Sequence, residues 1–211
     1  MERNIWRTSE THLDNTGKTD VTEGLQALID AAAAGRLPHV SLELVLSNRE
    51  DAYALERARA AGIEAVVCAR GRGEDRAAWE ARMLRALRQR RVQMLILAGF
   101  LAILSSEFVA AYPGRILNVH PSLIPSFCGK GYYGLRVHQA ALEYGVKVTG
   151  ATVHLVNEIP DGGRILLQKA VDIEPGDTPE TLQRRVMEQA EWILLPRAAE
   201  MLAQEIEEGR A

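Results

Sequence analysis

Apolar positions along the chain follow two spacings that alternate. Short apolar runs predict strands at residues 40–47, 63–68, 93–98, 115–120, 146–157 and 165–173. Apolar residues that recur every three or four positions predict helices at residues 21–34, 51–61, 74–91, 135–144 and 178–204, with a short one that ends at residues 108–111. Pro196 is expected to kink or split the last helix, because proline lacks a backbone N–H. Strands and helices in regular alternation predict an α/β domain with a largely parallel sheet.

Composition narrows the class of protein. The chain has 211 residues, of which 47% are hydrophobic, so there is ample material for a core and overall disorder is excluded. No apolar stretch approaches the roughly 20 residues of a membrane span. The first 20 residues have no apolar core of signal-peptide type, and two cysteines make no disulfide scaffold, so a cytoplasmic location is expected. A net charge of −3 predicts no nucleic-acid partner.

Residues suited to acid/base chemistry lie at the end of one predicted strand and on the loop that follows another. The strand RILNVH ends in Asn118 and His120, whose side chains point to the same face because side chains alternate along a strand. Asp161 precedes two glycines on a predicted loop, where the backbone can approach a ligand closely. The Asn118 amide is suited to stabilising an oxyanion, and a carboxylate near His120 is expected to raise the pKa of that imidazole. These three residues are candidates for acid/base chemistry on a substrate that brings its own nucleophile.

Each of these residues also has a structural interpretation. A lone histidine at a strand end is often a hydrogen-bonded structural residue, and Asp-Gly-Gly is a common turn. Cys128 has no evident base beside it and is not favoured as a nucleophile. The spacing of His120, His138 and His154 fits no common metal-ligand pattern, so no metal is expected. The arginines between residues 70 and 91 are interleaved with acidic residues, which favours a solvated helix face.

Longer segments resemble a known family. The runs LAGFLAILSSEFVAAYPGRILNVHPSLIPSFCGKG, GATVHLVNEIPDGG and ILLQKAVDIEPGDT resemble the folate-dependent formyltransferases, and Asn-x-His-Pro-Ser-Leu-Ile-Pro is specific to them. The segments LQALIDAAAAGRL and SNREDAYALERARAAGI are similar to the glycinamide ribonucleotide formyltransferases within that family. The resemblance implies a single Rossmann-like domain at residues 21–205, flanked by an atypical segment at 1–20 and a tail at 206–211.

The resemblance also implies a reaction and its site. Members transfer a formyl group from 10-formyltetrahydrofolate to the amine of glycinamide ribonucleotide in purine biosynthesis. His120 matches the catalytic acid/base, Asn118 the residue that holds the formyl oxygen, and Asp161 the carboxylate that tunes the histidine. The positions that match folate-contacting residues are Arg76, Leu101, Ala102, Ile103, Leu104, Asn118, Asn157 and Glu158. Glu191 matches a glutamate that contacts the ribose of the substrate.

The N-terminus departs from the family. Members begin with a short apolar strand and a Gly-x-Gly-Ser/Thr-Asn loop, whose N–H groups bind the ribonucleotide phosphate. Here the segment before Leu25 reads TGKTDVTEG, and residues 1–18 have no apolar run like the first strand. The first strand and the glycine loop are therefore expected to be atypical or missing. Either the segment before about Leu25 is altered or out of frame, or the chain is a genuine variant with a damaged substrate site.

Three functions follow as hypotheses. The leading one is glycinamide ribonucleotide formyltransferase activity, with the ribonucleotide and the folate as small-molecule partners. A second is another folate-dependent formyltransferase or a formyltetrahydrofolate hydrolase, although these carry an additional domain that this chain is too short to hold. A third is a folate-binding pseudoenzyme with impaired ribonucleotide binding. No membrane partner is expected, and the chain is predicted to be a monomer or a homodimer.

Overall fold

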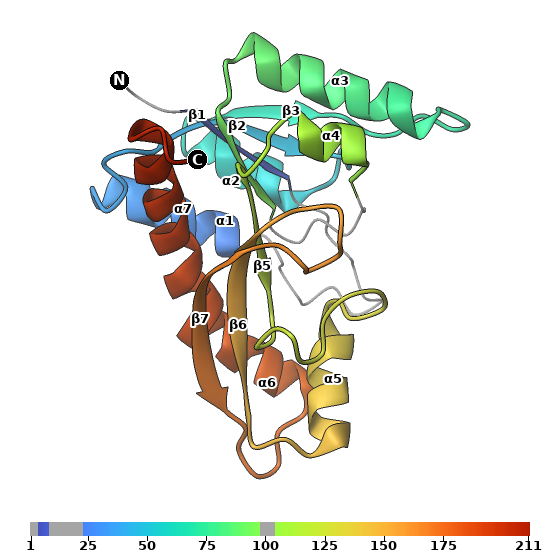
Figure 1. Cartoon of the computed structure of the whole chain (residues 1–211), viewed down its shortest axis with the longest axis vertical. Helices are drawn as coiled ribbons and strands as arrows, with labels where there is room; N and C mark the ends of the chain where they lie inside the picture. The colour runs from blue at the N-terminus through green and yellow to red at the C-terminus, as the bar shows by residue number, and fades with distance from the viewer. Residues whose placement is uncertain (1–3, 9–22, 98–103) are drawn as a thin grey trace.

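The computed structural model describes residues 4–8, 23–97 and 104–211, which form a seven-stranded sheet flanked by helices (Figure 1). The strand order is β3-β2-β1-β4-β5-β6-β7. The strands are β1 (Asn4–Thr8), β2 (Ser41–Ser47), β3 (Glu64–Val67), β4 (Met94–Leu97), β5 (Ile116–His120), β6 (Val148–Leu155) and β7 (Ile165–Asp172). The pairs from β3 through β5 are parallel, and β5–β6 and β6–β7 are antiparallel. The predicted α/β class with a largely parallel sheet is confirmed.

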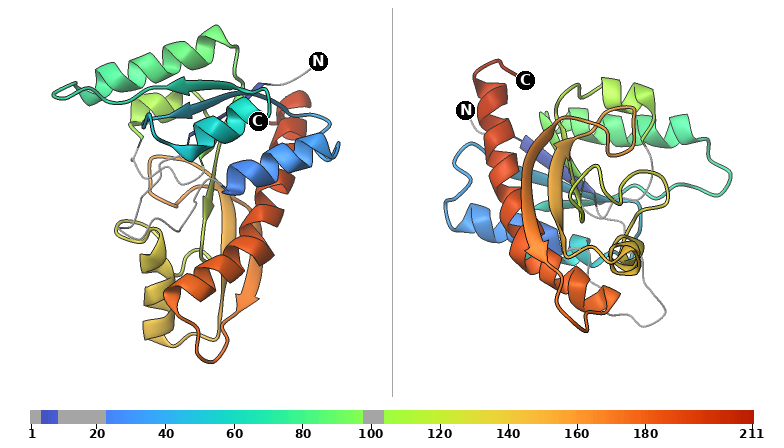
Figure 2. Two further views of the ribbon diagram at one scale, coloured as in Figure 1. Left: turned by 180° about the vertical axis from the view of Figure 1, so that it is seen from behind. Right: turned by 60° about the horizontal axis from the view of Figure 1, so that its bottom comes forward.

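Helices cover both faces of this sheet. They are α1 (Glu23–Ala33), α2 (Tyr53–Ala60), α3 (Arg76–Gln89), α4 (Ser106–Ala110), α5 (Leu135–Tyr144), α6 (Pro179–Val186), a π-helical segment η1 (Met187–Glu191) and α7 (Trp192–Glu207). In Figure 2, α1 and α7 lie side by side on one face. On the other face, α3 and α4 lie over the strands around β1–β4 (Figure 1).

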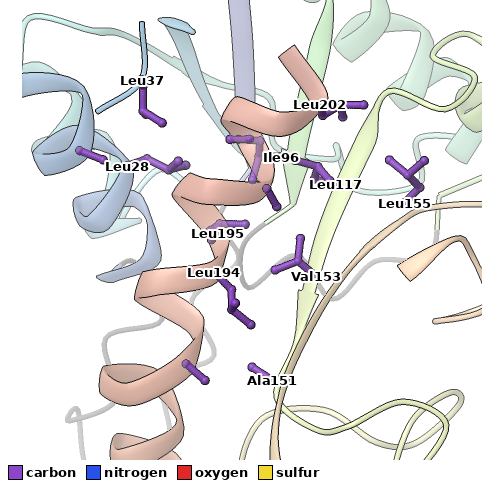
Figure 3. Packing of buried hydrophobic residues seen from close by; sticks show 14 of the residues in the cluster. Leu28, Leu37, Ile96, Leu117, Ala151, Val153, Leu155, Leu194, Leu195 and Leu202 are labelled. Carbon is purple, nitrogen blue, oxygen red and sulfur yellow. The ribbon is translucent and has the colours of Figure 1, made fainter. Parts of the chain in front are cut away.

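Two hydrophobic clusters lie on opposite faces of the sheet. Strand β4 contributes to both clusters, because its four residues are all buried and their side chains alternate between the two faces. Ile96 joins the cluster beneath α1 and α7, which Figure 3 shows with Leu117, Val153 and Leu195. Leu95 and Leu97 join the cluster beneath α3 and α4. Helix α3 contributes residues spaced four apart, as its sequence predicts: Trp79, Met83 and Leu87.

The first strand, which was expected to be either atypical or missing, is present. Strand β1 lies inside the sheet between β2 and β4, and its backbone pairs in parallel with both. The sequence NIWRT does not look like an apolar strand, and only its pairing with β2 and β4 identifies it as one. The glycine-loop question concerns residues 9–22, which lie outside the described residues.

The long C-terminal helix is divided at a different point from the one predicted. Pro196 lies inside α7, which continues through it to Glu207. The irregularity comes earlier, where the backbone is π-helical at residues 187–191. A π-helical turn accommodates an extra residue without ending the helix, and such turns often occur at functional sites.

Among the described residues, no helix is both long enough and apolar enough to cross a membrane.

Candidate active site

Asn118 and His120 project from the last residues of β5 onto the same face, as predicted. The antiparallel neighbour β6 places His154 directly opposite Asn118 and Thr152 opposite His120. Side chains of directly paired residues lie on the same face and close together. The amide Nδ2 of Asn118 is accordingly 3.2 Å from Nε2 of His154. His120 is 5% exposed and His154 is also buried.

Asp161 is presented by the tight loop between β6 and β7. A side chain at Gly163 would place its Cβ 1.8 Å from the carbonyl oxygen of Leu155, so only glycine fits there. Asn157 braces the same loop, since its Oδ1 accepts from the N–H of Ile159 at 2.9 Å. Asp161 itself has a positive φ of 55°, which aspartate tolerates better than most residues. The close contact of this backbone is thus with Leu155, and its predicted approach to a ligand stays a prediction.

The carboxylate of Asp161 lies between two imidazoles. Its Oδ2 is 3.6 Å from Nδ1 of His120, and its Oδ1 is 3.5 Å from Nε2 of His154. The structure therefore brings the three predicted residues, Asn118, His120 and Asp161, into one cluster. His154 completes it, and sequence reasoning considered that residue only as a metal ligand. Its alternation along β6 was readable, but the antiparallel register that sets it opposite Asn118 was not.

The loop that follows β5 also contacts this cluster. The carbonyl oxygen of Phe127 is 2.8 Å from Nε2 of His120. The N–H of Gly129 donates to Oδ2 of Asp161 at 2.7 Å. Both contacts are shorter than the direct approach of His120 to Asp161, so the loop makes the closest polar contacts with this pair.

Burial determines the net pKa shift of His120. Burial lowers the pKa of this imidazole, and this effect exceeds the raising effects of the Asp161 charge and of the Phe127 carbonyl. The expectation that the carboxylate would raise the pKa of His120 is correct for the Asp161 contribution but wrong for the net direction. His120 is thus predominantly uncharged at neutral pH and suited to accept a proton.

The pKa of Asp161 shifts in the direction that keeps its carboxylate charged. Burial works to raise the pKa of this carboxyl group, but its contact with His154, the charge of His120 and the Gly129 N–H together hold the pKa below its usual range. A carboxylate that accepts hydrogen bonds and faces imidazoles stays ionised at neutral pH. The cluster therefore combines an amide donor, a neutral imidazole and a fixed negative charge.

The other predicted site residues do not all join this cluster. Arg76 begins α3, and its Nε donates to the buried Glu80 at 2.9 Å. Leu104 directly precedes the Ser105 cap of α4, whereas Leu101, Ala102 and Ile103 lie outside the described residues. Asn157 uses its side chain within the Asp161 loop, and Glu158 is exposed beside it.

Glu191 is the last residue of the π-helical segment that separates α6 from α7. It is partly buried, and burial raises the pKa of its carboxyl group to about 7. No described group of three or more histidine, cysteine or acidic side chains is arranged to hold a metal ion.

Comparison with known proteins identifies relatives of this chain. The formyl transferase family matches residues 18–198. The phosphoribosylglycinamide formyltransferase of Escherichia coli (strain K12) is 38% identical over 165 residues, which cover 78% of this chain and 75% of that protein. The chloroplastic phosphoribosylglycinamide formyltransferase of Arabidopsis thaliana is 43% identical over 145 residues, 68% of this chain and 50% of that one. This chain therefore spans half the length of the plant relative.

Solved structures agree with these matches. Glycinamide ribonucleotide transformylase 1 from Symbiobacterium toebii superposes with a TM-score of 0.83 and 36% identity, covering 96% of this chain and 88% of that one. Phosphoribosylglycinamide formyltransferase from Brucella melitensis superposes with a TM-score of 0.82 and 37% identity, covering 96% of each chain.

Proposed function

Because the chain belongs to the formyl transferase family, we propose that it transfers a formyl group from 10-formyltetrahydrofolate to the amine of glycinamide ribonucleotide, in de novo purine biosynthesis. The observation that carries this proposal is the convergence of Asn118, His120 and Asp161 at the carboxyl end of β5. That end of a parallel sheet is where ligands bind in open α/β folds.

The cluster supplies what formyl transfer requires. As the substrate amine bonds to the formyl carbon, negative charge develops on the formyl oxygen, and the Asn118 amide donates to it. The uncharged His120 accepts the proton that the amine loses. His120 then gives a proton to N10 of the folate as the bond between N10 and the formyl carbon breaks. Tetrahydrofolate leaves, and the formylated amine remains. Asp161 stabilises the imidazolium that forms in between.

The remaining predicted residues supply binding in this proposal. Leu104, Asn118 and the loop at Asn157 and Glu158 contact the pterin, and Arg76 contacts the folate. Leu101, Ala102 and Ile103 are assigned to the pterin by the resemblance alone, because they lie outside the described residues. The ribose hydroxyls contact Glu191, where the π-helical turn presents a carboxyl group. The half-buried Asn118 amide and the uncharged imidazole of His120 fit a neutral formyl group better than a charged ligand.

Substituting the acid/base pair tests this proposal. His120→Ala and Asp161→Asn are each expected to lower formyl transfer by about 100-fold or more, since proton transfer by a positioned group contributes about that much. The measurement is the rate of folate product formation, with circular dichroism to establish that each variant folds. His39→Ala is the control, because His39 pairs with Glu200 on α7, away from this cluster. Near-normal activity in either variant would remove the assigned role.

A second candidate is a folate-binding protein with impaired ribonucleotide binding. The sequence favours it because TGKTDVTEG replaces the phosphate-binding glycine loop, and Asp20 and Glu23 bring negative charge to that segment. Losing a few charge-assisted hydrogen bonds would weaken phosphate binding by roughly 100-fold or more.

Separate titrations with glycinamide ribonucleotide and with a folate analogue discriminate between the two candidates. The second candidate predicts folate binding and weak ribonucleotide binding that recovers when a family-type strand and Gly-x-Gly-Ser-Asn loop replace residues 1–24. If the unaltered chain binds the ribonucleotide as tightly as that chimera, the second candidate is excluded.

A further inference from the structure

Residues 127–129 contact both members of the His120–Asp161 pair at once. The Phe127 carbonyl is 2.8 Å from Nε2 of His120, and the Gly129 N–H is 2.7 Å from Oδ2 of Asp161. By comparison, Nδ1 of His120 and Oδ2 of Asp161 are 3.6 Å apart, which is beyond hydrogen-bond range. The three-residue segment thus bridges two side chains that do not hydrogen-bond to each other directly.

We propose that residues 127–129 form a clamp that selects the tautomer of His120, and that Phe127 and Tyr144 are positioning residues that anchor it. A carbonyl oxygen only accepts, so the 2.8 Å contact requires a proton on Nε2 of His120. In the uncharged ring the other nitrogen, Nδ1, then carries the lone pair. Nδ1 is therefore the atom at which His120 takes up and releases a proton, on the side of the Asp161 carboxylate. This inference rests on the proposed acid/base role of His120.

The opposite tautomer meets a conflict at the clamp. With the proton on Nδ1, the ring would place its Nε2 lone pair against the Phe127 carbonyl oxygen. Two acceptors 2.8 Å apart repel each other, so the clamp would have to move away. The only contact that would favour the opposite tautomer among those described is with Oδ2 of Asp161, which could accept from a proton on Nδ1. That oxygen is 3.6 Å from Nδ1, beyond hydrogen-bond range, so the 2.8 Å contact with Phe127 is the stronger of the two.

The backbone of the clamp needs an anchor. Phe127 has a φ of 48° and Gly129 a φ of 83°, both in the left-handed region. Glycine adopts that region freely, but a bulky aromatic residue rarely does, and such a conformation persists only when its surroundings enforce it. At Phe127 this conformation coincides with a carbonyl that faces His120.

Aromatic contacts supply that anchor. The Phe127 ring makes edge contacts with Tyr132, at 6.3 Å between centroids, and with Tyr144, at 5.9 Å. Tyr144 is the last residue of α5 and is 80% exposed. Its ring adds little to the core, so its contact with Phe127 is the interaction that a substitution there would chiefly remove.

Nitrogen-15 NMR of histidine-labelled protein tests the proposal. At a pH above the His120 titration, the wild-type ring is expected to show a protonated Nε2 and an unprotonated Nδ1, with the signals assigned by their loss in His120→Gln. In Tyr144→Ala both nitrogens shift toward values averaged between the tautomers, and kcat falls by about tenfold, as misplacement of a catalytic group predicts. Phe127→Gly, which keeps a positive φ accessible but deletes the ring, behaves in the same way.

Two controls separate the clamp from a general structural effect. Tyr144→Phe keeps the ring and is expected to retain the wild-type tautomer and kcat. Tyr133→Ala removes a tyrosine from the same loop whose ring instead faces the Arg136 guanidinium at 4.9 Å, and it is expected to leave the His120 nitrogens unchanged. A wild-type ring protonated on Nδ1, or unchanged nitrogen shifts in both Tyr144→Ala and Phe127→Gly, would overturn the proposal. If the shifts behave as expected but the wild type transfers no formyl group, the proposed function fails and the clamp stands.

Discussion

At the level of single residues, His120 shows how two opposing effects combine. The carboxylate of Asp161 stabilises the charged ring, and burial stabilises the uncharged one. Burial is the larger of the two, which leaves a base that is ready to accept a proton at neutral pH. His138 shows the same effect without a carboxylate beside it: burial and the charge of His120 lower its pKa to about 4.

Gly163 is the residue whose replacement we expect to damage the site most through the backbone. A Cβ there would approach the carbonyl oxygen of Leu155 to 1.8 Å, and neither backbone segment can yield without moving the Asp161 loop. Gly163→Ala should therefore lower the free energy of unfolding by at least about 2 kcal/mol, measured by urea denaturation. Formyl transfer should fall as well, because Asp161 would move.

Gly71→Ala is the matched control for this substitution. A Cβ at Gly71 would meet only the Glu74 side chain, at 3.5 Å, which is an ordinary contact. The free energy of unfolding of Gly71→Ala should lie within about 0.5 kcal/mol of that of the wild type. Equal stabilities for the two variants would show that the β6–β7 loop relaxes around an added methyl group.

At the level of elements, the start of α6 is held by a dense polar turn. Thr178 caps the helix and Pro179 occupies its first position. Asp177 accepts from the backbone N–H of Glu174 at 2.8 Å and pairs with Arg185 at 2.5 Å, and its side chain is only 3% exposed. The hydrogen bond with Arg185 is the main cause that lowers the pKa of Asp177 to about 2.

Asp177 should consequently make the stability of the protein depend on pH. A carboxyl group whose pKa is lower in the folded state stabilises the fold above its usual pKa, and this contribution is lost as the pH falls through about 2. Asp177→Asn should lower the free energy of unfolding by about 1–2 kcal/mol at pH 7. The difference from the wild type should shrink as the pH falls from about 4 to 2.

Denaturation at several pH values measures this effect, and the exposed Asp172→Asn on β7 is the matched control. If the free energy of unfolding of Asp177→Asn stays below that of the wild type by the same amount down to pH 2, packing and not the charge stabilises this turn.

At the level of the whole molecule, the sheet depends on a strand from the N-terminus. Backbone pairing of β1 with both β2 and β4 joins the β2–β3 pair to the rest of the sheet. Hydrogen exchange should therefore find the amides of residues 5–8 protected to a degree similar to those of β4. Exchange at the rate of an unstructured peptide would mean that β2 and β4 are joined in another way.

Local patterns predict most elements and part of the site. Apolar spacing is enough to place α3, whose buried face carries Met83 and Leu87, and β4, which is buried on both sides. Strand alternation is enough to set Asn118 and His120 on one face, because it depends only on the backbone of β5. The glycines after Asp161 likewise indicate a backbone that cannot accept a side chain.

Contacts between distant segments require the tertiary structure. The pairing of Asn118 with His154 depends on the antiparallel register of β6, which returns 28 residues after the end of β5. The net direction of the His120 pKa shift depends on how deeply the folded chain buries the ring. The Phe127 carbonyl reaches Nε2 only through the path of the loop after β5. Strand β1 is the clearest case, since NIWRT carries only two strongly apolar residues, Ile5 and Trp6. Its place comes from the hydrogen bonds that β2 and β4 offer on either side, and no spacing along the chain encodes them.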